Sequence, residues 1–256
     1  MSKESPDKTA IPANPEKLPV YASTMMANRR QRLRKETRKL INERGLSGFS
    51  VREVCRRAEV APRTLYNAFQ NKNRLIGLAI RESYEKIQSQ LAYSTDANTV
   101  TGIIHRTISL NRGNLSARNY VEALVHIYFD PETPEDLWDM LQSMSVRRVA
   151  RWLGSQQNKG LVEPWAIPQS VAARMADAQW GTIRSWVAGR LTDEEYIYQV
   201  VEATLLSLVA VLQGPPRAEA VAFLETMHLT GQVPDFPNAT VRISIGSDAH
   251  NIQNPP

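Results

Sequence analysis

The chain has 256 residues, a net charge of +5 and a single cysteine, Cys55. One cysteine excludes an internal disulfide, and four scattered histidines without a CxxC pair argue against a structural zinc site. The first residues, MSKESPDK, are polar, and apolar runs such as LVAVL at 208–212 are far too short to span a bilayer. We therefore expect a soluble, cytoplasmic protein that holds neither a metal ion nor a cofactor.

The charge is distributed unevenly along the chain. Residues 1–90 carry 19 Lys and Arg against 9 Asp and Glu, a net of +10, whereas residues 91–256 carry 12 against 17, a net of −5. A basic N-terminal module joined to a mildly acidic remainder is typical of a protein whose first part binds the phosphate backbone of nucleic acid. Surface charge can also serve solubility alone, so this asymmetry favours nucleic acid only modestly.

Helical periodicity covers most of the chain. Residues 1–22 contain four prolines and no periodic apolar pattern, which predicts a flexible arm. The tail at 231–256 is similar, except that Val241, Ile243 and Ile245 have the spacing of one short strand with no visible partner. Between these ends the sequence predicts an all-α protein. Helix breaks are expected at 45–48, 59–61, 70–71, 94–98, 111–114, 130–133, 158–168 and 189–192.

The first two predicted helices have clear boundary signals. The first helix begins near Ser23 or Thr24, and Gly45 suits a left-handed cap at its end. The second begins at Ser50, which together with Glu53 fits an S-x-x-E capping box. These signals fix where both helices lie along the sequence.

A third, short helix follows a three-residue turn at 59–61. Pro62 occupies its first position, where the missing N–H costs nothing, and Leu65 and Phe69, four residues apart, are expected to anchor it to the core. Asn71 then caps a fourth helix over 72–91. Three short helices with such a turn are the ingredients of a helix-turn-helix domain, which we place at 23–71.

The exposed side of the third helix carries groups suited to the major groove of DNA. Arg63 can bond to guanine and Asn67 to adenine, while the methyl group of Thr64 can contact a thymine methyl. Tyr66 and Lys72 are better placed for phosphates. An ordinary three-helix cluster with solvated arginines is the alternative.

The run GFSVREVCRRAEVAPRTLYNAFQNKNRLIGLAI resembles the DNA-binding segment of tetracycline-repressor (TetR) family transcriptional regulators. The resemblance covers about residues 24–91 and depends on Phe49-Ser50-Val51, Val60, Thr64-Leu65-Tyr66, Phe69, Lys72 and Leu75. It implies DNA contacts from the positions Arg52, Arg63, Thr64, Tyr66, Asn67 and Lys72. Ser50 joins this set because a helix N-terminus attracts phosphate.

Two positions depart from the pattern of the TetR family. Glu59 stands where the turn usually has glycine, and Ala61 stands where serine often caps the third helix. Both departures affect the turn that sets the angle of the third helix, and neither removes an expected DNA contact.

The remainder, 72–230, is expected to form a helical regulatory and dimerisation domain, joined to the first by the helix at 72–91. Its further helices are predicted at about 99–110, 116–129, 134–157, 169–188 and 193–213. The last two of these are apolar on more than one side, which favours pairing with a second copy as a four-helix interface, as the resemblance also implies. A buried hairpin within one monomer is the alternative. The expected interface residues are Met175, Trp186, Val201, Leu205, Leu208 and Leu212.

By the same resemblance, the protein is a homodimeric repressor that a small-molecule effector releases from a pseudo-palindromic double-stranded DNA operator. Aromatic and adaptable residues of the second domain are candidates for the effector pocket, although each could equally be plain core. These residues are Tyr120, His126, Tyr128, Trp138, Met144, Trp152 and Trp180.

Two other function classes remain as alternatives. A helical enzyme is disfavoured because Glu122 and His126 lack the Glu-x-x-His spacing of di-iron bundles, and no phosphate loop or nucleophile elbow is present. Cys55 lies on the inward side of the second helix, as a core residue would. We therefore expect no catalytic residues. A protein that binds DNA without sequence preference is the second alternative, distinguished by a flat response to DNA sequence.

Overall fold

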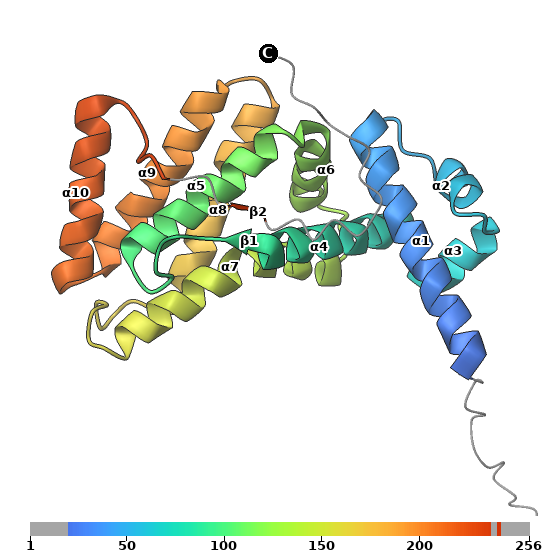
Figure 1. Cartoon of the computed structure of the whole chain (residues 1–256), viewed down its shortest axis with the longest axis horizontal. Helices are drawn as coiled ribbons and strands as arrows, with labels where there is room; N and C mark the ends of the chain where they lie inside the picture. The colour runs from blue at the N-terminus through green and yellow to red at the C-terminus, as the bar shows by residue number, and fades with distance from the viewer. Residues whose placement is uncertain (1–19, 237–239, 242–256) are drawn as a thin grey trace, which may run out of the picture.

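The computed structural model describes residues 20–236 and 240–241 and confirms the all-α class. Two helical groups lie at opposite ends of an elongated molecule, and one long helix, α4, runs between them (Figure 1). The helices are α1 (Val20–Arg44), α2 (Val51–Arg57), α3 (Pro62–Phe69), α4 (Lys72–Gln90), α5 (Val100–Leu115), α6 (Arg118–Phe129), α7 (Glu135–Gln157), α8 (Pro168–Val187), α9 (Asp193–Val211) and α10 (Gly214–Thr230).

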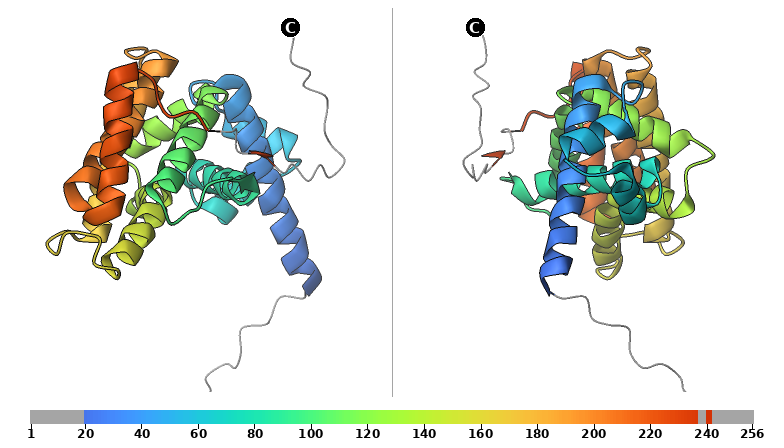
Figure 2. Two further views of the ribbon diagram at one scale, coloured as in Figure 1. Left: turned by 60° about the vertical axis from the view of Figure 1, so that its left-hand side comes forward. Right: turned by 90° about the vertical axis from the view of Figure 1, so that its right-hand side faces the viewer.

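Two hydrophobic clusters correspond to these groups. The smaller one joins α1, α2, α3 and the start of α4, and it consists of Leu33, Leu40, Val54, Cys55, Ala58, Leu65, Phe69 and Leu75. The larger one fills the bundle formed by α5 to α10, and it also includes Ile41 of α1 and Ile76 and Ile80 of α4. Because α1 and α4 contribute to both clusters, they connect the helix-turn-helix to the bundle (Figure 2).

The first helix ends as expected and begins earlier than expected. Gly45 has a φ of 66° and its N–H donates to the carbonyl of Ile41 at 2.8 Å, which confirms the left-handed cap. The helix begins at Val20, ahead of the predicted Ser23 or Thr24. The rest of the expected N-terminal arm, residues 1–19, lies outside the described residues.

The predicted break at 111–114 is wrong, because α5 continues through it to Leu115. Asn111 is fully buried there, and its side-chain amide donates to the carbonyl of Thr107 at 2.7 Å, one turn earlier in the same helix. Asparagine and glycine indicate a turn when they are exposed, but in this segment tertiary contacts keep the chain helical. The helices α6 to α9 begin and end within two residues of the predicted bounds.

A helix that the sequence analysis did not separate, α10, changes the interpretation of α9. It starts at Gly214, Pro215 and Pro216 and packs against α9 and α5, while α8 covers another side of α9. The apolar circumference of α9 is therefore covered largely within one chain. All six residues expected at the dimer interface are buried in the monomer, with Met175 at 8% and Leu205 and Leu208 at 0% exposure, so this choice of interface residues is corrected.

The C-terminal segment also differs from expectation. The strand β2 (Thr240–Val241) pairs antiparallel with β1 (Leu91–Ala92), which follows α4 directly, so the tail strand does have a partner. Before it, Val233 and Phe236 pack on the bundle, and the ring of Phe236 stacks on His105 at a centroid distance of 4.7 Å. Ile243 and Ile245 lie outside the described residues.

Candidate nucleic-acid interface and internal cavities

The second helix begins with half of the predicted capping box. The N–H of Glu53 donates to Ser50 Oγ at 3.4 Å, as expected. The carboxylate of Glu53, however, turns away from the cap and accepts hydrogen bonds from Arg56 at 2.8 Å and Arg57 at 2.9 Å. These bonds from Arg56 and Arg57 lower the pKa of Glu53 to about 2. Glu53 thus shares its single negative charge between two arginines of α2, and Ser50 is exposed at the start of that helix.

The turn between α2 and α3 shows both departures from the TetR-family pattern. Glu59 has a φ of 54°, so a residue with a Cβ occupies the left-handed region that glycine usually takes. The N–H of Val60 donates back to the carbonyl of Cys55 at 3.0 Å and closes the turn. Ala61 provides no side-chain cap, and α3 starts at Pro62. The turn therefore has the expected path at some cost in backbone strain.

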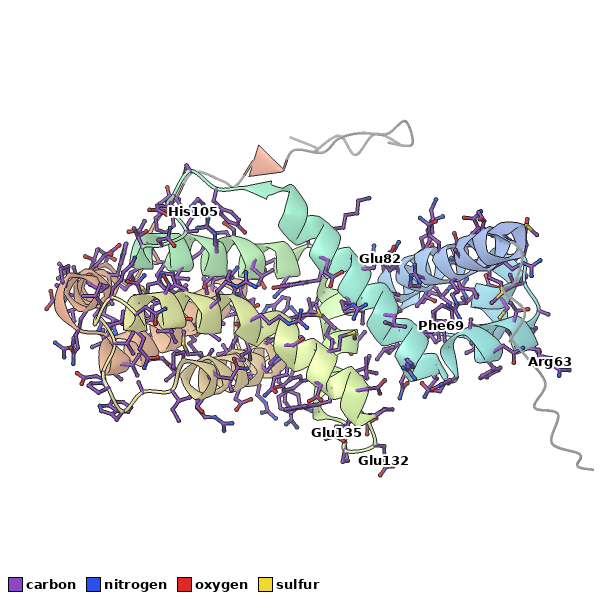
Figure 3. The ribbon with its side chains drawn as sticks, turned by 90° about the horizontal axis from the view of Figure 1, so that it is seen from below. Arg63, Phe69, Glu82, His105, Glu132 and Glu135 are labelled. Atoms are coloured by element: carbon purple, nitrogen blue, oxygen red, sulfur yellow. The ribbon has the colours of Figure 1, made fainter. Side chains whose placement is uncertain are left out.

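The recognition helix, α3, is fastened on one side and open on the other. Leu65 and Phe69 are buried in the small cluster, which confirms the predicted anchors. Asn71 Oδ1 accepts from the N–H of Arg74 at 2.8 Å, which confirms the cap of α4. The opposite side of α3 lies at the outer end of the molecule, where Figure 3 shows Arg63 pointing away from the bundle.

The expected DNA-contacting residues are accessible to solvent. Ser50, Arg52, Arg63, Tyr66, Asn67 and Lys72 are exposed, and Thr64 is half-buried. Among the described residues, neither Arg52, Arg63 nor Lys72 forms an ion pair, in contrast to Arg57, which lies 2.8 Å from Glu43 and 2.9 Å from Glu53. Their charges are therefore available to an outside anion.

Two residues of α1, which sequence reasoning did not select, also belong to this surface. Arg29 and Arg30 border a depression of about 230 Å³ together with Thr64 and Asn67 of α3. Neither arginine forms an ion pair within the described part of the chain. Their position opposite the apolar stripe of the first helix was visible in the sequence, but only the packing of α1 on α3 places them beside the recognition helix.

The comparisons with known proteins agree with this geometry. Residues 33–78, from the middle of α1 into α4, match the sequence profile described as bacterial regulatory proteins of the tetR family. Solved structures of TetR-family transcriptional regulators share the fold along most of the chain. Residues 33–78 therefore carry the sequence pattern of the tetR family, and the chain shares the fold of the solved regulators of that family.

Three solved structures illustrate the likeness. A putative TetR-family regulator from Rhodococcus sp. is 18% identical with a TM-score of 0.56, covering 71% of this chain and 98% of its own. Thermus thermophilus FadR, a TetR-family repressor in complex with lauroyl-CoA, is 16% identical with a TM-score of 0.57, covering 73% and 97%. RolR, in complex with resorcinol, is 16% identical with a TM-score of 0.60, covering 83% and 98%. A search of curated proteins found no match.

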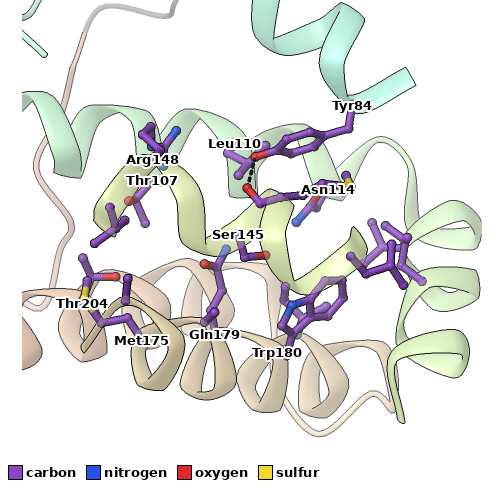
Figure 4. A pocket seen from close by; sticks show the side chains of 18 residues that line it. Tyr84, Thr107, Leu110, Asn114, Ser145, Arg148, Met175, Gln179, Trp180 and Thr204 are labelled. Atoms are coloured by element: carbon purple, nitrogen blue, oxygen red, sulfur yellow. Dashed lines mark hydrogen bonds between the residues drawn. The ribbon is translucent and has the colours of Figure 1, made fainter. Parts of the chain in front are cut away.

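Two adjoining cavities lie inside the bundle. The inner cavity, of about 80 Å³, is bordered by α4 to α9, and Figure 4 shows the side chains that line it. The outer cavity, of about 460 Å³, lies between α4, α5, α6 and α7, and Phe236 of the C-terminal segment lines it. They share six lining residues, which are Tyr84, Leu110, Asn114, Val121, Leu124 and Met144.

Three of the seven expected pocket residues line these cavities. Tyr120 borders the outer one, Trp180 the inner one and Met144 both. Tyr128 lies behind the wall, where its ring stacks on Trp180 at 4.5 Å, and Trp138 packs on Tyr128 in turn at 5.6 Å.

The remaining two expected residues are elsewhere. Trp152 is a buried core residue outside both linings. His126 is exposed on α6, where its Nε2 lies 3.9 Å from Glu122 Oε1. Within the described residues no group of His, Cys, Asp and Glu side chains is arranged to hold a metal ion. Similarly, none of the described helices combines the length and apolarity that crossing a bilayer requires.

Sequence reasoning missed most polar residues of the inner cavity. Thr107, Asn114, Ser145, Arg148 and Gln179 line it. Their spacing is that of ordinary helix positions, and an inventory of aromatic residues does not select them. Only the packing of α5, α7 and α8 brings them together.

Proposed function

We propose that this protein is a homodimeric repressor that binds a pseudo-palindromic operator and is released from it by a small-molecule effector. The proposal assigns residues 23–71 to DNA binding and 72–230 to effector binding and dimerisation, in the cytoplasm. The observation that carries it is the pairing of an open, cationic recognition surface with a cavity that the connecting helix α4 itself borders.

The DNA contacts follow from which groups are free on the recognition surface. Arg63, Thr64 and Asn67 are proposed to contact base edges, since they lie along the open side of α3. The phosphate contacts are assigned to residues at the borders of that side, where position and charge matter more than base chemistry. These are Ser50, Arg52, Tyr66 and Lys72, with Arg29 and Arg30 added from the structure.

The dimer surface is proposed on the outward faces of α8 and α9. Leu206 of α9 is 53% exposed and lies beside Ala203 and Ala210 on one side of that helix. On α8, Ala178 and Gly181 are exposed, and a Cβ added at Gly181 would meet no atom within 4 Å. Small residues let two helix pairs approach closely, and a two-fold dimer would space its recognition helices for half-sites about 34 Å apart.

Effector release is proposed to act through α4. Tyr84 of this helix lines both cavities, and Glu82, two residues earlier, accepts hydrogen bonds from Arg34 at 2.7 Å and Arg38 at 3.0 Å on α1. A ligand that favours one position of α4 therefore biases the position of the recognition helices. The lauroyl-CoA and resorcinol complexes of FadR and RolR support a ligand-binding role for a bundle of this fold.

Selection of bound sequences from a random DNA pool, with the purified full chain, tests the proposal. We expect one enriched pseudo-palindrome, protected on one face of the duplex. Enrichment of a single half-site would contradict the dimer, and a flat sequence preference would favour non-specific DNA packaging. A reporter gene behind the recovered site should be silenced by the protein, and activation instead would contradict repression.

A further inference from the structure

Arg148 of α7 is the only charged residue among those that line the inner cavity. Its Nε is buried and has no hydrogen-bond partner among the residues that the structure describes. Within the described residues its guanidinium forms no ion pair, and the lining of the outer cavity likewise contains no carboxylate. A guanidinium that borders an apolar cavity without a counter-ion is partly removed from water, which is unfavourable for a charged group.

The neighbours of Arg148 do not compensate its charge. Arg106 of α5 is engaged, with its guanidinium donating to the carbonyl of Gly102 at 2.8 Å and lying 4.3 Å from the ring centroid of Tyr93. The hydroxyl of Tyr84 donates to the carbonyl of Met144 at 3.3 Å. Burial raises the pKa of both Tyr84 and Tyr93, against the opposing effect of Arg148, so neither phenol supplies a negative charge near neutral pH.

The rest of the wall of the inner cavity is mostly apolar, and it also contains a further hydrogen-bond donor. Leu110, Val121, Leu124 and Leu141 form much of its wall. Trp180 lines it as well, and its indole Nε1 is a second buried donor that has no partner in the described part of the chain. In Figure 4 Arg148 and Thr107 lie at one end of the cavity and Trp180 near the other. The unmatched polar groups are therefore donors, which calls for acceptors on the ligand.

We propose that the effector of this protein is a small organic anion, a carboxylate on an apolar or aromatic body, whose charged group pairs with Arg148. This inference rests on the proposed effector function and names the chemical class of the ligand. The guanidinium can bind a carboxylate through two parallel hydrogen bonds, and a bond to a charged group is stronger than one between neutral groups. The apolar body would fill the adjoining outer cavity, whose volume of about 460 Å³ suits a small ligand.

Matched pairs of probes test the charge requirement. Benzoate, cinnamate and octanoate, each beside its neutral carboxamide, are titrated into the full chain without DNA, with tryptophan fluorescence and thermal unfolding as readouts. We expect at least one carboxylate to bind about tenfold to a hundredfold more tightly than its amide. If no carboxylate of the series binds more tightly than its amide, the proposal is overturned.

Variants at two adjacent positions assign the effect to Arg148. Arg148→Met should abolish the preference for the carboxylate, whereas Arg148→Lys should retain part of it. Arg147→Met is the matched control, because it removes the same charge from an exposed neighbour and should leave the preference unchanged. Without any probe, Arg148→Met should not lower Tm, since it removes an unpaired cation rather than a contact. A preference that survives Arg148→Met, or a Tm loss equal to that of a core truncation, contradicts the proposal.

A DNA-release assay separates this inference from the proposed function. If the carboxylate binds through Arg148 but does not reduce affinity for the selected operator, the anion site stands and effector release fails. If carboxylate and amide release DNA equally well, effector release is supported, and the proposal that the effector must be an anion is contradicted.

Discussion

The hydroxyl of Tyr196 on α9 donates a hydrogen bond of 2.5 Å to Oδ1 of Asn111 on α5, and both side chains are fully buried. The same hydroxyl accepts from Asn114 Nδ2 at 2.8 Å, while Gln179 Nε2 on α8 donates to Asn111 Oδ1 at 3.2 Å. One polar network thus ties three helices together beside the inner cavity, which Asn114 and Gln179 line. Burial raises the pKa of Tyr196 well above its ordinary value, so the hydroxyl keeps its proton and the network is neutral.

Removing this hydroxyl should destabilise the bundle. Tyr196→Phe removes two hydrogen bonds inside the core, and we expect a loss of about 1–3 kcal/mol in the free energy of unfolding. Urea denaturation followed by circular dichroism measures it. Tyr198→Phe on the same helix is the control, since Tyr198 is half-buried and its hydroxyl forms no hydrogen bond within the described residues, so that its loss should change little. Equal effects of the two variants would contradict the network's contribution.

Local signals account for what the sequence predicted well. The caps at Gly45 and Asn71 and the anchors Leu65 and Phe69 depend on residues within a few positions of each other, and the structure has them as expected. The break predicted at Asn111 failed for the opposite reason. Its partner Tyr196 is 85 positions away, and nothing near Asn111 in the sequence indicates it.

The lining of the cavity and the dimer interface also depend on contacts between distant parts of the chain, which local sequence signals do not predict. Arg148 is one of several arginines on α7, and its lack of an ion pair within the described residues follows from which helices surround it rather than from its spacing. The apolar surface of α9 was assigned to a partner chain because α10 was not recognised behind Gly214 and its two prolines. A helix that is apolar on several sides must pack against other helices on those sides. Periodicity alone does not say whether these helices belong to the same chain.

The strained turn before the recognition helix should be open to improvement. Glu59→Gly places glycine at a φ of 54°, and we expect the free energy of unfolding to rise by roughly 1 kcal/mol. Glu59→Ala is the control, because both variants lose the exposed 3.6 Å contact to Arg32 but only glycine relieves the strain. Thermal unfolding of the three proteins should place glycine above both others. An equal Tm for glycine and alanine would show that the left-handed turn costs nothing.

Acid should loosen the junction between α1 and α4. Burial tends to raise the pKa of Glu82, but the hydrogen bonds and charges of Arg34 and Arg38 outweigh it, and the net pKa is below 4.5. A carboxyl whose pKa is lowered in the folded state adds stability at pH values above its unfolded pKa. That stability is lost as pH falls through the folded pKa. We therefore expect Glu82→Gln to reduce stability at pH 7 and to flatten its decline below about pH 5.

Unfolding curves measured between about pH 3 and pH 7 provide this comparison. Glu85→Gln serves as the control, since Glu85 is an exposed residue one turn later on α4 with only a 3.7 Å contact to Arg81. A decline with pH that is identical in wild type and Glu82→Gln would rule out this carboxyl as the source.

Charge on the outward face of α9 should break the dimer. Leu206→Glu puts a carboxylate where the proposed two-fold interface brings apolar surfaces together, and we expect the mass in light scattering to fall to that of a monomer. Leu229→Glu on α10 is the control, because Leu229 is 88% exposed and lies outside the proposed interface. A dimer that survives the first variant and dissociates with the second would move the interface to α10.

Base recognition and phosphate binding should separate on the two sides of α3. Asn67→Ala removes a proposed base contact, so we expect about 1–3 kcal/mol less discrimination at one operator position and a broader selected sequence. Lys72→Ala removes an exposed charge at the start of α4 that forms no ion pair among the described residues, so affinity should fall alike for all sequences and the magnitude of the salt slope should drop by about 1. Arg29→Ala should resemble Lys72→Ala if α1 contacts only phosphates. If Lys72→Ala instead changed the preferred sequence and left the salt slope untouched, this division of roles would be wrong.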